Sequence, residues 1–400
     1  MSVTTALHRV AASTIYNFIM SRANERGRMP FAADSSLVHA SGPDADRILI
    51  LGGPVILGMG VTSHELGVAG SVARGLARIT GRGADVAAQG FVSFDLERCV
   101  TELQRVDLGR FDGVILQVGS RELLSLTPIG AWSGGVHAIT RVLAERKPPG
   151  LPVMILSTLP VSESINAPAW ARRIMNALVP RMNEVLRDAC ETSGVARYVE
   201  LRPDPERSDF ARDARHIYQR WADDIVPALA AAMDEAKPRS VSPVNEMERQ
   251  QALENLHISH ESDARVDRIV KMARDTFGVH SASLTVIDRD IQWIKSAVGM
   301  PDDSIAREDA FCNTTIATEG VFVVEDLAAD EAFASLPWVG GDDGQRFYAG
   351  YPLEAPGGQR IGALCVLDTA PRHFSRDDAS MLRDLALSAQ AVLWEAAEAS

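Results

Sequence analysis

Three short runs of almost uninterrupted apolar residues constrain the fold of this chain more than any other feature. They are RILILGG at 47–53, FDGVILQVG at 111–119 and LPVMILSTLP at 151–160. Continuous Val, Ile and Leu are typical of parallel strands buried on both faces. Segments with helical spacing of apolar residues separate the runs, for example 64–80 and 169–193. Residues 45–236 therefore predict an α/β domain with helices on both faces of a parallel sheet.

The pattern changes at a polar, proline-containing stretch, KPRSVSP at 237–243. Together with the start of the charged helical segment that follows, this stretch is typical of a linker, which we place at 237–248. Beyond it we expect a helix, then five strands at 281–290, 291–299, 321–327, 347–354 and 361–369, and a last helix from about Arg376. A tight turn at Asp290 joins the first two strands. Residues 249–400 therefore predict an α+β domain around a largely antiparallel sheet.

Composition and charge exclude several classes of protein. The formal net charge is -13, and no run of Lys and Arg is present, so we expect no nucleic-acid partner. No apolar run is long enough for a transmembrane helix, and the N-terminus lacks a signal-peptide cleavage site. We therefore expect a cytoplasmic protein in which residues 1–44 form a helical extension. The four cysteines are widely spaced and form no CxxC pair, which predicts neither a disulfide framework nor a metal site, and we expect no cofactor.

Four segments of the first domain resemble, in order, the motif blocks of SGNH (GDSL-like) hydrolases. They are the run from Ile48 into GGPVILGMG, the glycine of AAQGFVSFDL, QVGSRELL at 117–124 and DARH at 213–216. The resemblance implies a flavodoxin-like three-layer α/β sandwich. It also places the candidate site at the carboxyl ends of the strands.

The resemblance places a proline where these hydrolases carry their serine nucleophile. Pro54 has no hydroxyl to attack an ester and no N–H to hold an oxyanion. Arg121 stands at the position of the asparagine donor, which leaves Gly90 as an amide donor and Asp213 and His216 as the remaining acid–histidine pair. These residues imply a pseudoenzyme with a relic cleft for an anionic or carbonyl ligand. In the alternative interpretation, Asp213 and His216 are a structural pair before a helix.

A divergent esterase or acyltransferase regulated by the second domain is the competing hypothesis. It requires another nucleophile, for which Ser63, Ser93 and Ser120 are the nearest candidates in sequence. A serine acts in this way only within hydrogen-bond reach of the histidine.

The second domain resembles the GAF domains of bacterial signalling proteins. The resemblance rests on residues 260–300 and on AFCNTTI, VVEDL, RFYAGYPL and IGALCVLDT. It implies a sheet that holds a small molecule on one face, while the first and last helices pair with a second copy. The candidate pocket residues are Trp293, Phe311, Cys312, Asn313, Thr314, Phe347, Tyr348 and Tyr351. The first and last helices each carry an apolar stripe, because apolar residues recur at three- and four-residue spacing over 266–273 and 382–392. The alternative is that the pocket side chains and these stripes belong to the core of one chain.

The two cysteines of this domain are given different roles. Cys312 is the candidate reactive thiol because of its place among the pocket residues, and Cys365 is expected in the core. Some relatives of this domain reduce methionine sulfoxide through clustered cysteines, and we do not expect that activity because the two lie far apart in sequence.

These features together predict a non-catalytic sensing or scaffold protein. The second domain would bind an unidentified small molecule, and the first would serve as a second binding module. No kinase, cyclase or DNA-binding segment is present, so we expect output through the first domain or through a separate signalling protein.

Overall fold

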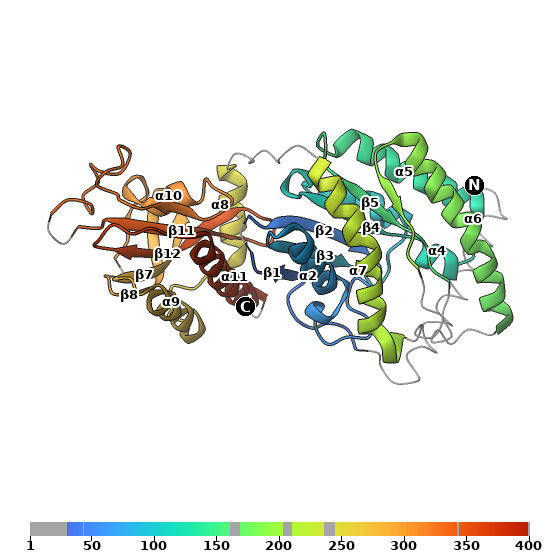
Figure 1. Cartoon of the computed structure of the whole chain (residues 1–400), viewed down its shortest axis with the longest axis horizontal. Helices are drawn as coiled ribbons and strands as arrows, with labels where there is room; N and C mark the ends of the chain where they lie inside the picture. Colours follow the sequence, from blue (N-terminus) through green and yellow to red (C-terminus); the bar gives the residue numbers. More distant parts are fainter. Residues whose placement is uncertain are drawn as a thin grey trace. The chain divides into compact units, whose positions relative to one another are not determined.

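The computed structural model describes residues 30–42, 44–160, 169–202, 210–235, 245–301, 303–341 and 344–398 (Figure 1). The chain divides into two compact units at residues 240 and 241, inside the expected linker. Helix α8 (Glu246–Leu256) begins before the expected end of that linker at residue 248. No helix in these ranges is long and apolar enough to cross a bilayer.

The first unit contains a six-stranded sheet of order β1-β3-β2-β4-β5-β6. Its strands are β1 (Leu37–Ala40), β2 (Asp46–Gly52), β3 (Ala84–Gly90), β4 (Gly113–Gln117), β5 (Val153–Leu156) and β6 (Arg197–Val199). All neighbouring pairs from β3 to β6 are parallel. Residues 48–51 and 114–116 are completely buried, because helices cover both faces of the sheet. The predicted mostly parallel α/β sheet is confirmed.

Strand β1 extends this sheet into the segment that was assigned to an N-terminal helical extension. Residues 37–40 pair antiparallel with residues 84–87 of β3. The strand is only four residues long, at the sheet edge, and half-buried, so it lacks the apolar run that identified the central strands. The helix expected near the N-terminus falls in residues 1–29, outside the described residues.

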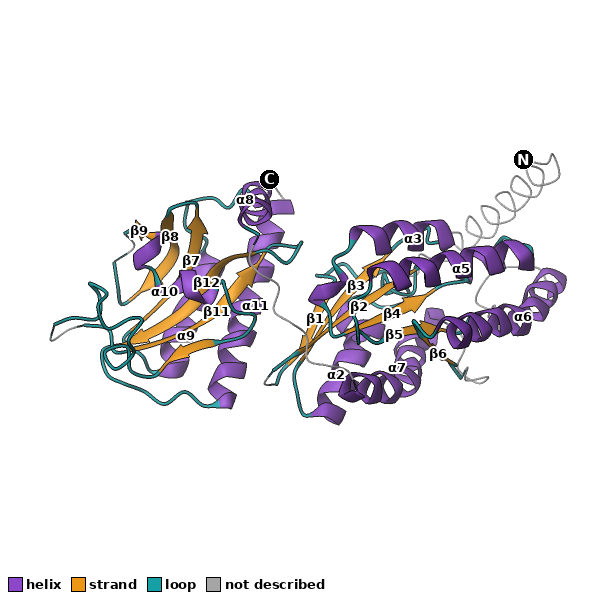
Figure 2. Ribbon diagram, turned by 90° about the horizontal axis from the view of Figure 1, so that it is seen from above, coloured by secondary structure: helices purple, strands orange, loops and turns teal. Residues whose placement is uncertain are grey.

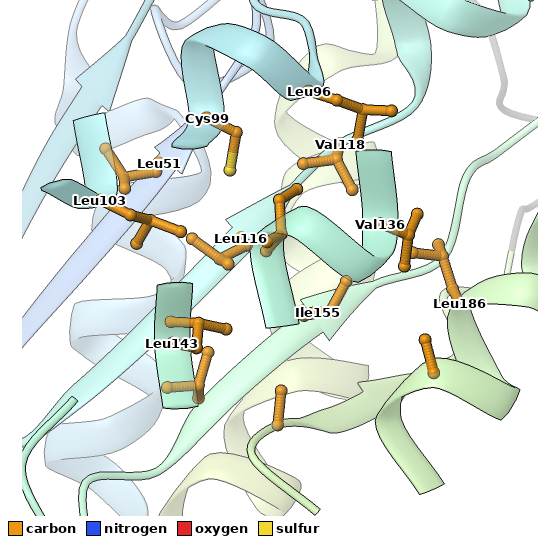
Figure 3. Close-up of a cluster of buried hydrophobic side chains, with 14 of the residues drawn as sticks. Leu51, Leu96, Cys99, Leu103, Leu116, Val118, Val136, Leu143, Ile155 and Leu186 are labelled. Carbon is orange, nitrogen blue, oxygen red and sulfur yellow. The ribbon is translucent and has the colours of Figure 1, made fainter. Parts of the chain in front are cut away.

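Two groups of helices sandwich the first sheet (Figure 2). Helices α2 (Val68–Thr80) and α7 (Phe210–Glu235) cover one face, and α3 (Leu96–Arg105), α5 (Ile129–Arg146) and α6 (Ala169–Ser193) cover the other. Figure 3 shows how Leu103, Leu143 and Leu186 from the second group converge on Leu116 and Ile155 of the strands. These two cores hold the ends of the strands in fixed positions.

The second unit contains an antiparallel sheet of order β10-β11-β12-β7-β8-β9. Its strands are β7 (Ser281–Asp288), β8 (Ile291–Val298), β9 (Ile305–Ala306), β10 (Phe322–Val324), β11 (Phe347–Glu354) and β12 (Arg360–Asp368). Arg289 and Asp290 form the tight turn between β7 and β8, and Arg289 has a φ of +46°. The expected α+β architecture is confirmed.

Alternation along the strands divides the side chains of the second sheet between two faces. Leu364 and Val366 of β12 pack beneath α9 (Ala264–Phe277) and α11 (Arg376–Glu398). Cys365, between them in sequence, packs on the opposite face with α10 (Phe311–Thr315). We call this opposite face the α10 face.

Candidate functional site

The carboxyl ends of β2 and β4 bring the first and third sequence blocks together. The chain leaves β2 for β3 on one side and continues to β4 on the other, and ligands of α/β proteins bind at such a switch point. The Gly53 N–H donates to Gln117 Oε1 at 3.2 Å, and Gln117 Nε2 donates to Ser120 Oγ at 2.8 Å. Sequence reasoning missed Gln117, whose signal is a polar residue at the end of an apolar strand.

Pro54 lies half-buried in the loop that follows β2. A methyl group added to Gly90 would lie 2.4 Å from the Leu57 nitrogen, so the backbone of this loop packs directly against Gly90. Tyr218 of α7 holds the loop, because its hydroxyl lies 3.0 Å from the Val55 carbonyl and 2.7 Å from the Met59 carbonyl.

Arg121 is the second residue of α4 (Ser120–Leu124), which begins just after β4. Its Nη1 donates to Ser93 Oγ, and its Nε lies 3.4 Å from Asp95 Oδ2. Asp95 also caps α3 by accepting the Arg98 N–H at 2.9 Å. Arg121 is therefore paired with a carboxylate, and an anionic ligand would compete with that carboxylate.

Glu122, the residue after Arg121, is buried, and its carboxylate binds the first residue of α3. Its Oε1 accepts the Leu96 N–H at 2.8 Å, and its Oε2 has no hydrogen-bond partner in the described part of the chain. Burial raises the pKa of the Glu122 carboxyl. No local sequence pattern indicates that this acidic residue is internal.

Asp213 and His216 lie in the first turns of α7, inside the helix and not before it. Asp213 Oδ2 is buried and lies 3.7 Å from Arg212 Nε, and no described group donates a hydrogen bond to it. His216 is half-buried. Tyr218, two residues further along α7, contacts the loop that carries Pro54, but residues two apart on a helix point to different faces, so this contact does not bring His216 to the loop.

A second acid–histidine pair was not predicted. The Asp34 Oδ1 atom accepts from both the backbone N–H of His64 at 2.8 Å and its Nδ1 at 2.9 Å. His64 is buried, and its Nε2 has no partner among the described residues. Asp34 lies in the segment that was predicted to be an N-terminal extension, outside the four motif segments, so the sequence comparison could not predict this pair.

In the second unit, three of the predicted pocket residues meet on the α10 face. The Tyr348 hydroxyl donates to Cys312 Sγ at 3.4 Å, and the Tyr348 and Phe311 ring centroids are 5.2 Å apart. Thr315 was missed: its Oγ1 lies 2.6 Å from the Tyr348 hydroxyl and is fully buried, while the predicted Thr314 is half-buried.

Asn313 connects α10 to the helix that follows the linker. Its Oδ1 accepts from Arg307 Nε at 2.8 Å. Both terminal nitrogens of Arg307 contact the Glu246 carboxylate of α8, at 2.9 and 3.2 Å. Arg249 holds the same carboxylate, and these hydrogen bonds keep the pKa of Glu246 well below its usual range.

The remaining predicted pocket residues lie elsewhere. Phe347 and Tyr351 pack in the core beneath α9 and α11, on the face opposite Tyr348. Trp293 packs beneath α8 and lies against His260, with ring centroids 4.1 Å apart. These three side chains therefore do not share a surface with Phe311 and Cys312.

Comparisons with known proteins identify one of the two units. Residues 261–393 match the GAF domain family. A cyclic di-GMP phosphodiesterase of Pseudomonas aeruginosa is 34% identical over 146 residues, which cover 36% of this chain and 25% of that protein. The chain thus spans about a quarter of that relative's length.

Solved structures resemble parts of the chain at low identity. A free methionine-R-sulfoxide reductase from Neisseria meningitidis is 19% identical over 38% of this chain and 88% of its own, with a TM-score of 0.30. A carbohydrate acetylesterase family member from Sinorhizobium meliloti is 14% identical over 47% and 99%, with a TM-score of 0.37. Scores this low support no conclusion about either unit. The family match and the antiparallel sheet identify residues 261–393 as a GAF domain.

Proposed function

We propose that this chain is a non-catalytic sensory protein whose GAF domain binds a small molecule on its α10 face. The first unit, a degenerate SGNH-like domain, serves as a second binding module. The observation that carries the proposal is Pro54 at the carboxyl end of β2, where the resemblance requires a serine.

The surroundings of Pro54 support the loss of ester chemistry. Proline offers neither a nucleophile nor an amide donor. The neighbouring Gly53 amide is already bonded to Gln117, and Arg121 is paired with Asp95. Loss of one oxyanion donor alone costs roughly 10²–10³ in rate.

The α10 face supports ligand binding by the GAF domain. It combines aromatic walls from Phe311 and Tyr348 with polar groups from Cys312 and Asn313, the combination that small-molecule sites use. The Asn313–Arg307–Glu246 contacts connect this face to α8, so a ligand that moves α10 changes the support of the helix that follows the linker.

Partners form a separate part of the proposal. Pairing of two copies through α9 and α11 is expected to involve the exposed Met272 and Met381, although most of the apolar stripes of these helices pack inside one chain. A separate signalling protein receives the output.

A divergent esterase or acyltransferase is the second candidate, favoured by the retained Asp213 and His216 on a helix that contacts the Pro54 loop. The test uses the full chain with short p-nitrophenyl esters, His216→Ala, and the exposed His137→Ala as matched control. We expect no hydrolysis above background in any of the three proteins. Hydrolysis abolished in His216→Ala and kept in His137→Ala would overturn the non-catalytic assignment.

Ligand binding is tested on the same proteins by thermal shift with a panel of nucleotides and metabolites. We expect one class of compound to raise the melting temperature of the wild type and to lose this effect in Asn313→Ala. Stabilisation that survives in Asn313→Ala would place the ligand away from the α10 face.

A further inference from the structure

Two cysteines separated by 53 residues meet on the α10 face. Cys312 lies in α10 and Cys365 in the middle of β12, and their sulfur atoms are 3.7 Å apart. Their distance in sequence had argued against clustered thiols, but the antiparallel sheet places β12 directly beneath α10. Both thiols are buried, and no disulfide joins them.

Hydroxyl groups lie on both sides of the sulfur pair. The Thr315 Oγ1 lies within hydrogen-bond distance of the Tyr348 hydroxyl, which in turn donates to Cys312 Sγ. On the other side, Ser283 Oγ lies 3.2 Å from Cys365 Sγ. These polar groups stand in an otherwise apolar cluster, where each needs a partner to be stable.

The hydrogen bonds make the two sulfurs unequal. Donation from Cys365 lowers the pKa of the Cys312 thiol, and the Tyr348 hydroxyl adds to this effect. The same contact with Cys312 raises the pKa of Cys365. The thiolate is the nucleophilic form of cysteine, so Cys312 is the sulfur that attacks first.

The first unit provides an internal comparison. Cys99 and Cys190 are each buried without a second thiol nearby among the described residues. Burial raises the pKa of both, that of Cys190 to about 11. Each of these two thiols therefore stays protonated, and neither has, in the described part of the chain, a partner thiol of lowered pKa that could react first.

We propose that Cys312 and Cys365 form a modification site that hydroperoxides oxidise reversibly to a disulfide. The Cys312 sulfur attacks one peroxide oxygen, the O–O bond breaks, and the other oxygen leaves as water or an alcohol after taking up a proton. The Cys365 sulfur then attacks the Cys312 sulfenic acid, and the S–O bond breaks to release water. Two thiols and one hydroperoxide thus give one disulfide, one alcohol or water, and one water. This inference does not depend on the identity of the GAF ligand.

The product requires a small movement and has a defined consequence. The sulfurs must approach from 3.7 Å to about 2.05 Å, which requires both side chains to rotate. The bond then fixes α10 to β12. Because Asn313 is the next residue, oxidation also restrains the contact with Arg307. A dithiol reductant reverses the change by exchange and becomes a disulfide itself.

The test treats the full chain with hydrogen peroxide, alkylates the remaining thiols and maps the peptides by mass spectrometry. We expect a disulfide between Cys312 and Cys365 that dithiothreitol removes, while Cys99 and Cys190 stay alkylatable. A folded chain in which Cys312 and Cys365 stay reduced, or in which Cys99 or Cys190 reacts equally fast, would overturn the proposal.

Variants test the assigned order of attack. Cys365→Ser should stop at a sulfenic acid on Cys312 that dimedone traps, and Cys312→Ser should leave Cys365 unmodified. Equal trapping on Cys365 in the second variant contradicts the assignment. Tyr348→Phe should slow oxidation about five-fold, the equivalent of one hydrogen bond of about 1 kcal/mol, whereas Tyr351→Phe, altered on the opposite face, should not.

If a serine variant fails to fold, as judged by circular dichroism, limited alkylation of the native wild type replaces it. Iodoacetamide should then label Cys312 before the other three cysteines. Labelling of Cys190 first would overturn the proposal without any variant.

Discussion

Replacing Arg249 with methionine should loosen helix α8 from the GAF domain. Arg249 is completely buried, although it is charged. Its Nε and Nη2 contact the Glu246 carboxylate at 2.9 and 2.6 Å, and its Nη1 donates to the Ile287 carbonyl of β7. Methionine keeps much of the apolar stem and supplies no donor, so the substitution isolates the hydrogen bonds from the packing.

The structure sets the size of the effect. The Ile287 carbonyl is buried, and loss of its guanidinium donor costs about 1–3 kcal/mol. The lost contact with Glu246 adds nothing to this figure, because Glu246 lies three residues earlier in α8 itself and stays with the helix when it detaches. A loss of about 1–3 kcal/mol corresponds to a roughly 5- to 150-fold rise in the population with α8 detached.

Hydrogen exchange followed by mass spectrometry on the full chain measures this population. Peptides from residues 246–256 should exchange faster by that factor in Arg249→Met, while peptides of the first unit serve as an internal control. Gln250→Met removes one donor to Glu246, at 3.0 Å, and is the matched control, with an expected change below about five-fold. Equal exchange of α8 in the two variants would refute the assignment of its docking to the buried arginine.

Three other perturbations test the first unit. Pro54→Ser should not restore hydrolysis of p-nitrophenyl esters, because Arg121 stays paired with its carboxylate, and a rise of about 100-fold over the wild type would contradict this. Glu122→Gln should become increasingly more stable than the wild type as pH rises above 4.5. Burial raises the folded-state pKa of Glu122, so the wild type loses stability as pH rises from the unfolded-state pKa through the folded-state pKa. Urea titrations across this range should show a growing difference in unfolding free energy. Tyr218→Phe removes the hydroxyl that holds the loop after β2 and should lower the unfolding free energy by about 1–2 kcal/mol, or the melting temperature by roughly 2–8 °C, with no loss on calorimetry as the contrary result.

Local apolar patterns predicted the central strands of both sheets, but they did not predict the edge strand β1. The central strands of the first sheet are continuous apolar runs because helices bury both faces, a condition visible in any window of residues. Strand β1 has the sequence LVHA and depends on pairing with a strand more than 40 residues away. A short edge strand of this kind carries too few apolar residues for a local pattern to detect.

Sequence patterns placed the candidate residues of the first unit near strand ends, but they did not predict which side chains contact one another. Gly90 is the last residue of β3, and Pro54 and Arg121 follow β2 and β4. The topology of the sheet places these strand ends together whatever the side chains are. The pairing of Arg121 with Asp95 depends on side-chain rotamers, and rotamers do not appear as a pattern in the spacing of residues along the sequence.

The alternation of side chains between the two faces of a strand also limited the prediction of the GAF pocket. The segment FYAGYPLE carries aromatic residues on both faces of β11. Its sequence does not say which face α9 and α11 cover, so Phe347 and Tyr351 were grouped with Tyr348. The structure separates them.

Two adjacent residues of α10 face two different networks. Cys312 contacts Cys365 and Tyr348 on the sheet, and Asn313 accepts from Arg307, which holds the carboxylate of Glu246 on α8. Any movement of this short helix therefore alters the support of α8. A ligand that bound equally well to every position of α10 would leave α8 unchanged, because a ligand shifts an equilibrium only by its difference in affinity between the two states. The proposed sensory function thus requires a ligand whose affinity differs between positions of α10.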